Sequence, residues 1–219
     1  APGEKNFNAV SQMANMDKDV PIFSLSHMAG IKGLFGGEYN YQHTEFEVFK
    51  RLRLSVAGFM DVKLSMGKIW GQVPYPLLIM PTANQSFVYK RETFHMMNAL
   101  EFATDQYAQI NMTWHMKGLI FNRIPLIKHM KLREIFVFNG LVGSLSDKNN
   151  PALCHAGLFR LPEGTGPMNG VPFLEVGAGI ENIFQIFRVV YYYRITHRDN
   201  NLTWLGKWGG LRFGVYTDF

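Results

Sequence analysis

The chain has 219 residues and a net charge of +5, and 47% of its residues are hydrophobic, 14% aromatic and 18% charged. This composition excludes disordered and collagen-like proteins, and the single cysteine excludes a disulfide scaffold. No block of Lys and Arg is long enough for a nucleic-acid-binding arm, and no apolar run approaches the roughly 18 to 20 residues of a membrane-spanning helix.

In the first half of the chain, apolar and polar residues alternate with a period of two, which predicts β-strands. We expect these strands at 21–30, 39–52, 59–67 and 97–104, with a long connection at 71–93. The clearest is 59–67, where four apolar residues alternate with three polar ones: Met60, Val62, Leu64 and Met66 against Asp61, Lys63 and Ser65. Residues 1–20 are expected to be an N-terminal extension or an incomplete strand.

The second half continues the same pattern, with strands expected at 107–118, 133–145, 173–180, 187–196 and 211–219. In 107–118 one face is wholly apolar: Ala108, Ile110, Met112, Trp114 and Met116. Long connections are expected at 146–171 and 198–207, and the first of these is rich in Asn, Pro and Gly. The sequence therefore predicts about nine antiparallel strands in one all-β domain, residues 21–219.

The alternation fits two classes of protein. In a soluble β-sandwich or lipocalin-like fold the apolar face packs on a core, whereas in a transmembrane β-barrel it contacts lipid and the polar face lines a lumen. Aromatic residues near the expected strand ends favour the barrel: Trp70, Tyr75, Tyr107, Phe121, Trp204, Trp208 and Phe219. In a barrel, the lumen-facing residues would be Asp61, Lys63, Glu101, His115, Lys117, Glu175, Arg188, Arg194 and Arg212. Both signs of charge occur in this set, which favours structural ion pairs over a path for anions or a substrate.

The last expected strand ends in an aromatic residue. Its residues Arg212, Gly214, Thr217 and Phe219 resemble the C-terminal signal of bacterial outer-membrane barrels, although Thr217 stands where a larger apolar residue is usual. The resemblance implies that the barrel assembly machinery recognises this strand, because an unpaired strand edge is a template for strand addition.

Three stretches carry a more specific resemblance: GKIWGQVPYPLL at 67–78, FNRIPLIKHMKLRE at 121–134 and VGAGIENIFQIFRVV at 176–190. They resemble the C-terminal barrel region of Bacteroidota outer-membrane proteins of unknown function that carry an N-terminal carboxypeptidase-regulatory-like domain. That family is distantly similar to the BamA/TamA surface-antigen barrels, although the Arg-Gly-aromatic loop motif of the BamA group is missing here. The resemblance implies a barrel of about sixteen strands in the bacterial outer membrane, of which this chain would form the C-terminal half.

If Phe219 lies at the periplasmic rim, strand parity places 104–106, 146–171 and 198–207 outside, and 71–93, 121–130 and 181–186 at the periplasmic side. The connection 121–130 mixes apolar residues with Arg123, Pro125, Lys128 and His129. This mixture predicts an interfacial turn, which either anchors the chain in the interface or contacts lipid headgroups or a periplasmic partner.

Candidate catalytic residues are scattered: Ser26 with His27, Cys154 with His155, and His115. They do not form a readable set of nucleophile, base and orienting residue, and no His or Cys spacing is typical of a metal site. We therefore expect a non-catalytic envelope protein, structural or associated with assembly, without cofactor or metal. Its expected partners are outer-membrane lipid, the assembly machinery and other envelope proteins. A transport barrel, such as the end of a TonB-dependent receptor or a porin-like channel, is the second hypothesis, and an outer-membrane enzyme is the third.

Overall fold

The fold is all-β, and its strands are antiparallel, as the alternation predicts. A computed structural model describes residues 6–9, 12–15, 20–34, 36–154, 159–168, 170–198 and 209–215. The strands are β1 (Asn6–Ala9), β2 (Gln12–Asn15), β3 (Ile22–Gly30), β4 (Tyr41–Arg53), β5 (Phe59–Gly71), β6 (Gln106–His115), β7 (Arg133–Ser144), β8 (Phe173–Ile183), β9 (Phe187–Arg194) and β10 (Gly210–Val215). Short helical turns lie between them: η1 (Ser55–Ala57), η2 (Tyr75–Leu77), η3 (Phe121–Arg123), α1 (Pro125–Lys128) and η4 (Asp147–Asn149).

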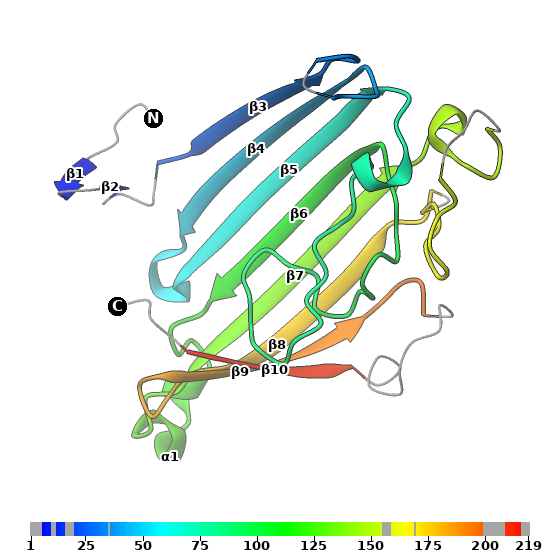
Figure 1. Cartoon of the computed structure of the whole chain (residues 1–219). Helices are drawn as coiled ribbons and strands as arrows, with labels where there is room; N and C mark the ends of the chain where they lie inside the picture. Colours follow the sequence, from blue (N-terminus) through cyan, green and yellow to red (C-terminus); the bar gives the residue numbers. More distant parts are fainter. Residues whose placement is uncertain are drawn as a thin grey trace.

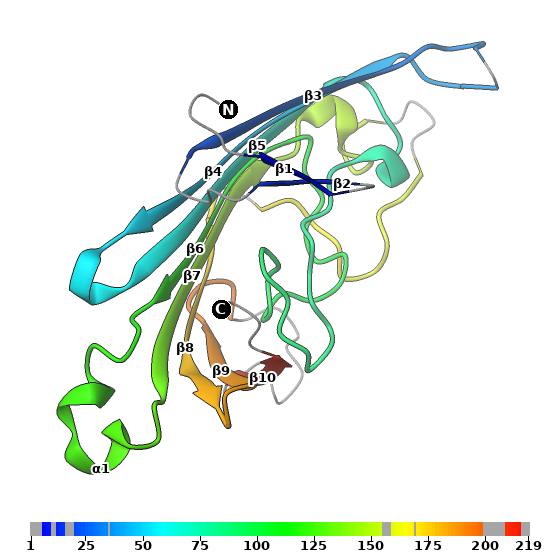
Figure 2. The same ribbon diagram turned by 90° about the vertical axis from the view of Figure 1, so that its left-hand side faces the viewer.

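Strands β3 to β10 form one eight-stranded sheet in chain order, each paired with the next (Figure 1). The sheet is curved but does not close on itself, so β3 and β10 are its two edges (Figure 2). Strands β1 and β2 pair with each other in a separate two-stranded sheet. No helix among the described residues is long and apolar enough to cross a membrane.

The prediction of a strand at 97–104 is wrong. These residues belong to the connection between β5 and β6, residues 72–105, which contains no sheet strand. The backbone turns at Leu100, whose φ is 57°, and Met97 and Phe102 are buried in one apolar cluster. The apparent alternation therefore reflects packing of an irregular segment, and its removal changes the sheet from nine strands to eight.

The parity assignment of residues 71–93 changes with the strand count. One strand fewer places the whole 72–105 connection at the same rim as 146–171 and 198–207, not at the opposite one. A contact along this rim supports the new assignment: Gln72 Nε2 donates to the carbonyl of Lys148, in the β7–β8 connection, at 3.1 Å.

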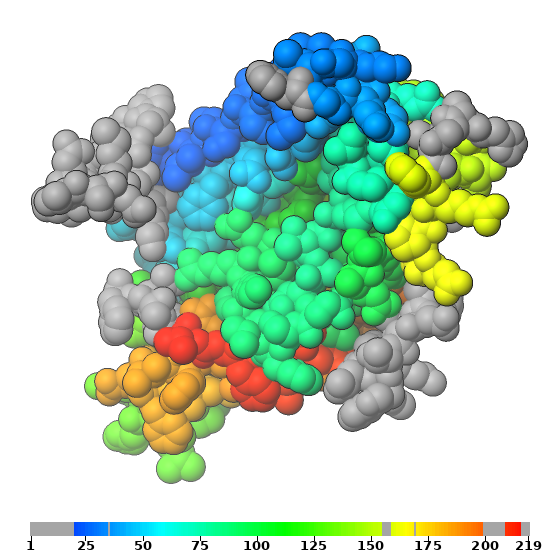
Figure 3. Space-filling view, viewed as in Figure 1, coloured from blue at the N-terminus to red at the C-terminus, as the bar shows by residue number. Residues whose placement is uncertain are grey.

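Residues 72–105, which we call the inward segment, fold back over the concave face of the sheet (Figures 2 and 3). Three buried clusters join this segment to the sheet: Phe94, Met97 and Phe102 with Leu141, Met168 and Phe173; Met96 with Ile135, Val137, Val190 and Tyr192; and Val73, Leu78 and Ala103 with Ile69. The apolar core thus lies between the concave face and the inward segment.

The inward segment also reaches the edge strand β10. The backbone N–H of Phe213 donates to the carbonyl of Phe87 at 2.8 Å, and the N–H of Tyr89 donates to the carbonyl of Phe213 at 2.7 Å. Val88 and Phe213 therefore form a parallel bridge, which satisfies one residue of the outer edge of β10.

The convex face of the sheet is apolar and exposed. Its large exposed side chains include Phe23, Leu25, Phe46, Leu64, Met66, Trp70, Phe136, Val142, Tyr191, Leu211, Phe213 and Val215. These side chains occupy alternate strand positions, opposite to the face that the inward segment covers. An exposed apolar surface of this extent is unusual for a soluble monomer, since such surfaces mark contact with protein or membrane.

At two positions a glycine leaves room for a neighbouring backbone atom or aromatic ring to lie close to the chain. Gly58 in the β4–β5 turn has φ 84°, and a Cβ at this position would lie 2.0 Å from the carbonyl oxygen of His115. Gly67 lies beneath the ring of Tyr107 on β6, where a Cβ would be 2.3 Å from the ring. The missing side chain lets Tyr107 lie across β5, and its hydroxyl donates to Glu45 on β4.

Candidate functional site

The concave face carries charged side chains that are buried under the inward segment. Because neighbouring residues of a strand point to opposite faces, the register of β4 to β10 gathers these charges on one side of the sheet. The buried members include His115, Glu175, Glu181, Arg188 and Arg194 on the sheet, and Glu101 on the inward segment. Charges removed from water must be paired, and the contacts show how each is held.

Arg194 and Glu101 form the most buried pair between the sheet and the inward segment. Arg194 Nη2 lies 2.5 Å from Glu101 Oε1, and Nη1 lies 2.9 Å from Oε2, which is a bidentate geometry. Arg194 also donates to the carbonyls of Met96 and Thr196, at 3.2 and 2.9 Å. Its guanidinium therefore fixes β9 to the inward segment at several points.

Glu175 on β8 holds the backbone of the same segment. Its two carboxylate oxygens accept the backbone N–H of His95 at 3.0 Å and of Met96 at 2.8 Å. Asn139 on β7 donates to Glu175 at 2.8 Å, and Arg212 on β10 donates to the carbonyl of His95. The carboxylate thus satisfies backbone donors of an irregular segment that lacks sheet pairing.

A second group of buried charged side chains lies on the concave face nearer the rim that carries α1. His115 Nδ1 on β6 is 2.7 Å from Glu181 Oε2 on β8, and Arg188 Nη1 on β9 is 3.3 Å from Glu181 Oε1. The ring of Phe59 stacks on His115 with a centroid distance of 4.6 Å. These contacts join β5, β6, β8 and β9 from within the concave face.

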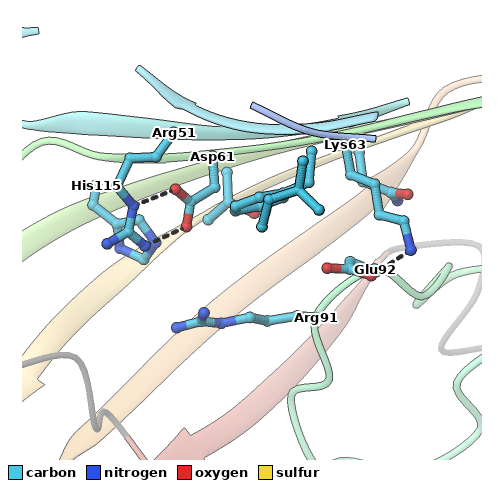
Figure 4. Close-up of a pocket in the computed structure, with 10 residues that line it drawn as sticks. Arg51, Asp61, Lys63, Arg91, Glu92 and His115 are labelled. Carbon is cyan, nitrogen blue, oxygen red and sulfur yellow. Dashed lines mark hydrogen bonds and ion pairs between the residues drawn. The ribbon is translucent and has the colours of Figure 1, made fainter. Parts of the chain in front are cut away.

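A cavity of about 300 Å³ lies between β4–β6 and the tip of the inward segment (Figure 4). Asp61 accepts two hydrogen bonds from Arg51, at 2.6 and 2.7 Å. Lys63 contacts Glu47 at 2.8 Å and Glu92 of the inward segment at 2.9 Å. Arg91, Asn111, Thr113 and His115 complete its polar wall. Charges of both signs line this cavity, and the Arg51–Asp61 and Lys63–Glu92 ion pairs lie in its wall.

His95 of the inward segment is buried in its uncharged form. Burial, together with the nearby Arg212 guanidinium, lowers the pKa of His95 to about 3. The other groups that face it are the Glu175 carboxylate, the Asn84 side chain and the rings of Tyr89 and Tyr192. Protonation of this imidazole would place a second cation beside Arg212 in a buried site.

This pKa predicts that acid weakens the fold. In the unfolded chain the pKa of His95 is about 6.5, so between about pH 6.5 and pH 3 the unfolded state binds more protons than the folded state. The stabilisation is complete above about pH 6.5 and is lost as the pH falls, by up to about 1.4 kcal/mol per pH unit. We expect the thermal midpoint of the purified protein to fall more steeply with acid than that of a His95→Gln variant.

The matched control for this prediction is His27→Gln, which removes an exposed histidine of β3. It should leave the pH profile unchanged. Equal pH slopes for the unsubstituted protein and His95→Gln would contradict the assignment of the acid sensitivity to His95.

The structure brings most of the predicted lumen-facing residues together. Asp61, Lys63, His115, Glu175, Arg188, Arg194 and Arg212 lie on the concave face, and Glu101 meets them from the inward segment instead of from a strand. Lys117 lies instead in the exposed turn after β6, with its ammonium 5.2 Å from the ring centre of Phe59.

The other predicted site residues belong to the turn between β6 and β7 and to the last part of the chain. Arg123, Pro125, Lys128 and His129 are exposed in the η3–α1 turn between β6 and β7. Arg212 and Gly214 are inward positions of β10, whereas Thr217 and Phe219 lie outside the described residues.

Several members of the network were not singled out from the sequence. Glu181 continues the alternation of Glu175, Gly177 and Gly179, so extending that pattern by two residues would have found it. Arg51 and Asn139 share the concave face by the same period within β4 and β7. His95 had no such signal, because its segment has no regular period.

The catalytic and metal candidates do not converge. Ser26 and His27 are adjacent on β3 and therefore point to opposite faces, and Cys154 contacts the Gln72 side chain. His155 lies outside the described residues. Within the described part of the chain, no three His, Cys, Asp or Glu side chains are grouped as metal ligands.

The chain matches a known protein family. The family described as "Family of unknown function (DUF5686) C-terminal domain" matches residues 1–149, which include β1 to β7 and η4. No curated protein matches the chain.

Proposed function

This chain belongs to the DUF5686 C-terminal domain family, and we propose that it forms part of a non-catalytic outer-membrane β-barrel with a structural or assembly-associated role. In this proposal the convex face contacts lipid hydrocarbon and the concave face lines the barrel interior. Further strands continue the sheet from the edges β3 and β10 to complete a barrel of about sixteen strands in the outer membrane of a Bacteroidota-like bacterium.

One observation carries the proposal: the sheet exposes its apolar face and buries its charged face. Phe23, Leu25 and Phe213 are at least half exposed, whereas Glu175, Glu181 and Arg194 are almost fully buried. A soluble half-buried sheet has the reverse arrangement, with apolar side chains inside. Lipid against the convex side would account for the exposed apolar side chains, because hydrocarbon is a favourable surrounding for them.

The soluble alternatives require a second layer on the convex side. In a β-sandwich, a second sheet would cover this face, but the described residues that lie against the sheet cover the concave side (Figure 2). The concave layer is the inward segment, whose contacts are both apolar and ionic. This one-sided covering supports a barrel wall over a sandwich.

The last strand supports a role for the assembly machinery as a partner. β10 is an edge strand that alternates apolar residues on the convex face with Gly210, Arg212 and Gly214 on the concave face. We propose that the machinery pairs with this strand before the barrel closes, and that 216–219 contribute the terminal part of the signal.

The inward segment favours a structural role over transport. It covers much of the concave face from β5 to β10 (Figure 3). Glu175, Arg194 and Arg212 hold it there through hydrogen bonds to its backbone and to Glu101. A path for solute along this face would require these contacts to open. Transport would therefore require the inward segment to move away from the concave face, whereas a structural role requires no such movement.

Conductance across a planar bilayer separates the two functions. We expect the protein that carries this chain to give no large, steady current, because the inward segment occupies the interior. Replacement of residues 84–100 by a Gly/Ser sequence of equal length should raise the conductance, since the ionic contacts of the segment are lost.

The matched control replaces residues 150–166 of the β7–β8 connection by a Gly/Ser sequence of the same length. This change should leave the conductance low. A large, charge-selective current through the unsubstituted protein would favour the transport barrel and contradict the structural role.

A further inference from the structure

The rim that carries α1 differs in charge from the opposite rim. Three connections form it, residues 54–58, 116–132 and 184–186, and we call them the basic rim (Figure 1). They contain four Lys and Arg residues and no Asp or Glu: Lys117, Arg123, Lys128 and Lys131. The described residues of the four connections at the opposite rim, within 31–40, 72–105, 145–172 and 195–209, include six Lys or Arg and six Asp or Glu.

The basic rim also exposes large apolar side chains. Val56, Leu126 and Phe184 are 85%, 82% and 86% exposed, one on each of the three connections. Ile120, Ile124, Met130 and Ile186 add to this surface. A mixture of basic and apolar side chains is typical of the membrane interface, where apolar parts enter the lipid and cationic groups reach the headgroups.

Hydrogen bonds hold the basic rim in shape. Glu134 at the start of β7 accepts the backbone N–H of Ile120 at 2.9 Å and that of Phe121. Asn182 Nδ2 near the end of β8 donates to the carbonyl of Lys131 at 2.7 Å, so the end of β8 is joined to the β6–β7 connection. The Glu134 carboxylate is therefore buried, with one of its oxygens accepting two backbone N–H groups of the β6–β7 connection.

An open cleft of about 580 Å³ lies between the β6–β7 connection and the turn from β8 to β9. Its walls include Met130, Lys131 and Leu132 on one side, and Ile183, Phe184 and Gln185 on the other. The cleft thus combines a cation at its edge with apolar side chains on both walls. This is the chemistry of a phospholipid, which has an anionic phosphate attached to hydrocarbon.

We propose that the basic rim binds anionic phospholipid, with the headgroup against Lys128 and Lys131 and an acyl chain against Met130 and Phe184. The proposal rests on the proposed function, which places the convex face in lipid and this rim at one membrane surface. Charge complementarity selects the occupant, because the described residues of the other rim carry equal numbers of cationic and anionic side chains and so offer no such preference. Each basic residue near an anionic surface favours it by about fivefold.

The test measures lipid selectivity of the full protein in phosphatidylcholine vesicles with and without phosphatidylglycerol. Spin-labelled phosphatidylglycerol should be enriched over spin-labelled phosphatidylcholine in the lipid next to the protein. The triple variant R123Q/K128Q/K131Q should lose most of this enrichment, and high salt should weaken it in the unsubstituted protein. The matched control K90Q/K148Q/R160Q removes three exposed basic residues of the opposite rim and should keep it.

Two results would overturn the proposal. The first is equal enrichment of phosphatidylglycerol around the unsubstituted protein and around R123Q/K128Q/K131Q. The second is release of the labelled lipid by millimolar inorganic phosphate, which would indicate a site for free phosphate. Sedimentation with preformed vesicles separates this proposal from the barrel itself. Protein that stays outside the bilayer yet sediments with phosphatidylglycerol vesicles only when Arg123, Lys128 and Lys131 are present would contradict the barrel and support the lipid site. Protein that stays outside the bilayer and does not sediment with the vesicles would contradict both the barrel and the lipid site.

Discussion

Replacing Glu101 by glutamine is expected to release the inward segment from the sheet. The substitution removes the charge that faces Arg194, whose guanidinium is almost fully buried and lies 2.5 Å from the Glu101 carboxylate. Removal of one partner of a buried ion pair costs about 3 to 5 kcal/mol, because the other charge stays in a low-dielectric site. We expect limited proteolysis to cut within 72–105 at least a hundredfold faster than in the unsubstituted protein.

Two control variants separate the buried charge from other effects. Glu92→Gln changes the same residue type in the same segment, but its partner Lys63 and its own carboxylate are partly exposed, so the expected cost is below about 1 kcal/mol. The double variant Glu101→Leu with Arg194→Met removes both charges and should recover much of the protection. Equal proteolysis rates for Glu101→Gln and Glu92→Gln would show that the Arg194 pair does not hold the segment.

Placing a charge on the convex face is expected to prevent membrane insertion. Ile110 lies on β6 between Leu64 of β5 and Gly140 of β7, in the middle of the sheet. An arginine on the lipid face of a barrel costs about 2 to 4 kcal/mol near the bilayer midplane. We therefore expect Ile110→Arg to lower strongly the fraction of protein that becomes heat-modifiable and membrane-embedded during refolding into vesicles.

The adjacent residue provides the control. Gln109 points to the concave face, where its side chain donates to Asn111 at 2.6 Å. Gln109→Arg adds the same charge one residue away but on the ion-paired side, so we expect a much smaller loss of insertion. Similar losses for both variants would indicate that the two faces do not differ in their surroundings.

The strands could be predicted from the sequence because their alternation is regular. In 59–67 and 107–118, each apolar residue has a polar neighbour, and the structure places the two sets on opposite faces of β5 and β6. The same pattern placed Glu175, Arg188 and Arg194 on one face. A period of two determines which residues share a face, so these residues required no knowledge of the register.

The irregular segment could not be predicted in this way. Residues 97–104 contain apolar residues at intervals that imitate a strand, yet they pack on the concave face without sheet pairing. The pairs that bind the segment join residues far apart in the chain, such as Glu101 with Arg194 and His95 with Glu175. Such contacts depend on the register of β7 to β9 and on the path of a long connection, and neither has a local signal.

The most direct measurement of the central claim is the accessibility of consecutive residues of β6 to oxygen dissolved in lipid. Single cysteines at positions 108 to 113, in a Cys154→Ser background, would carry a spin label in vesicles. Oxygen accessibility should be high at Ala108, Ile110 and Met112 and low at Gln109, Asn111 and Thr113. Low accessibility at all six positions, or contact of the Ile110 and Met112 labels with a water-soluble relaxing agent, would contradict the assignment of the convex face to lipid.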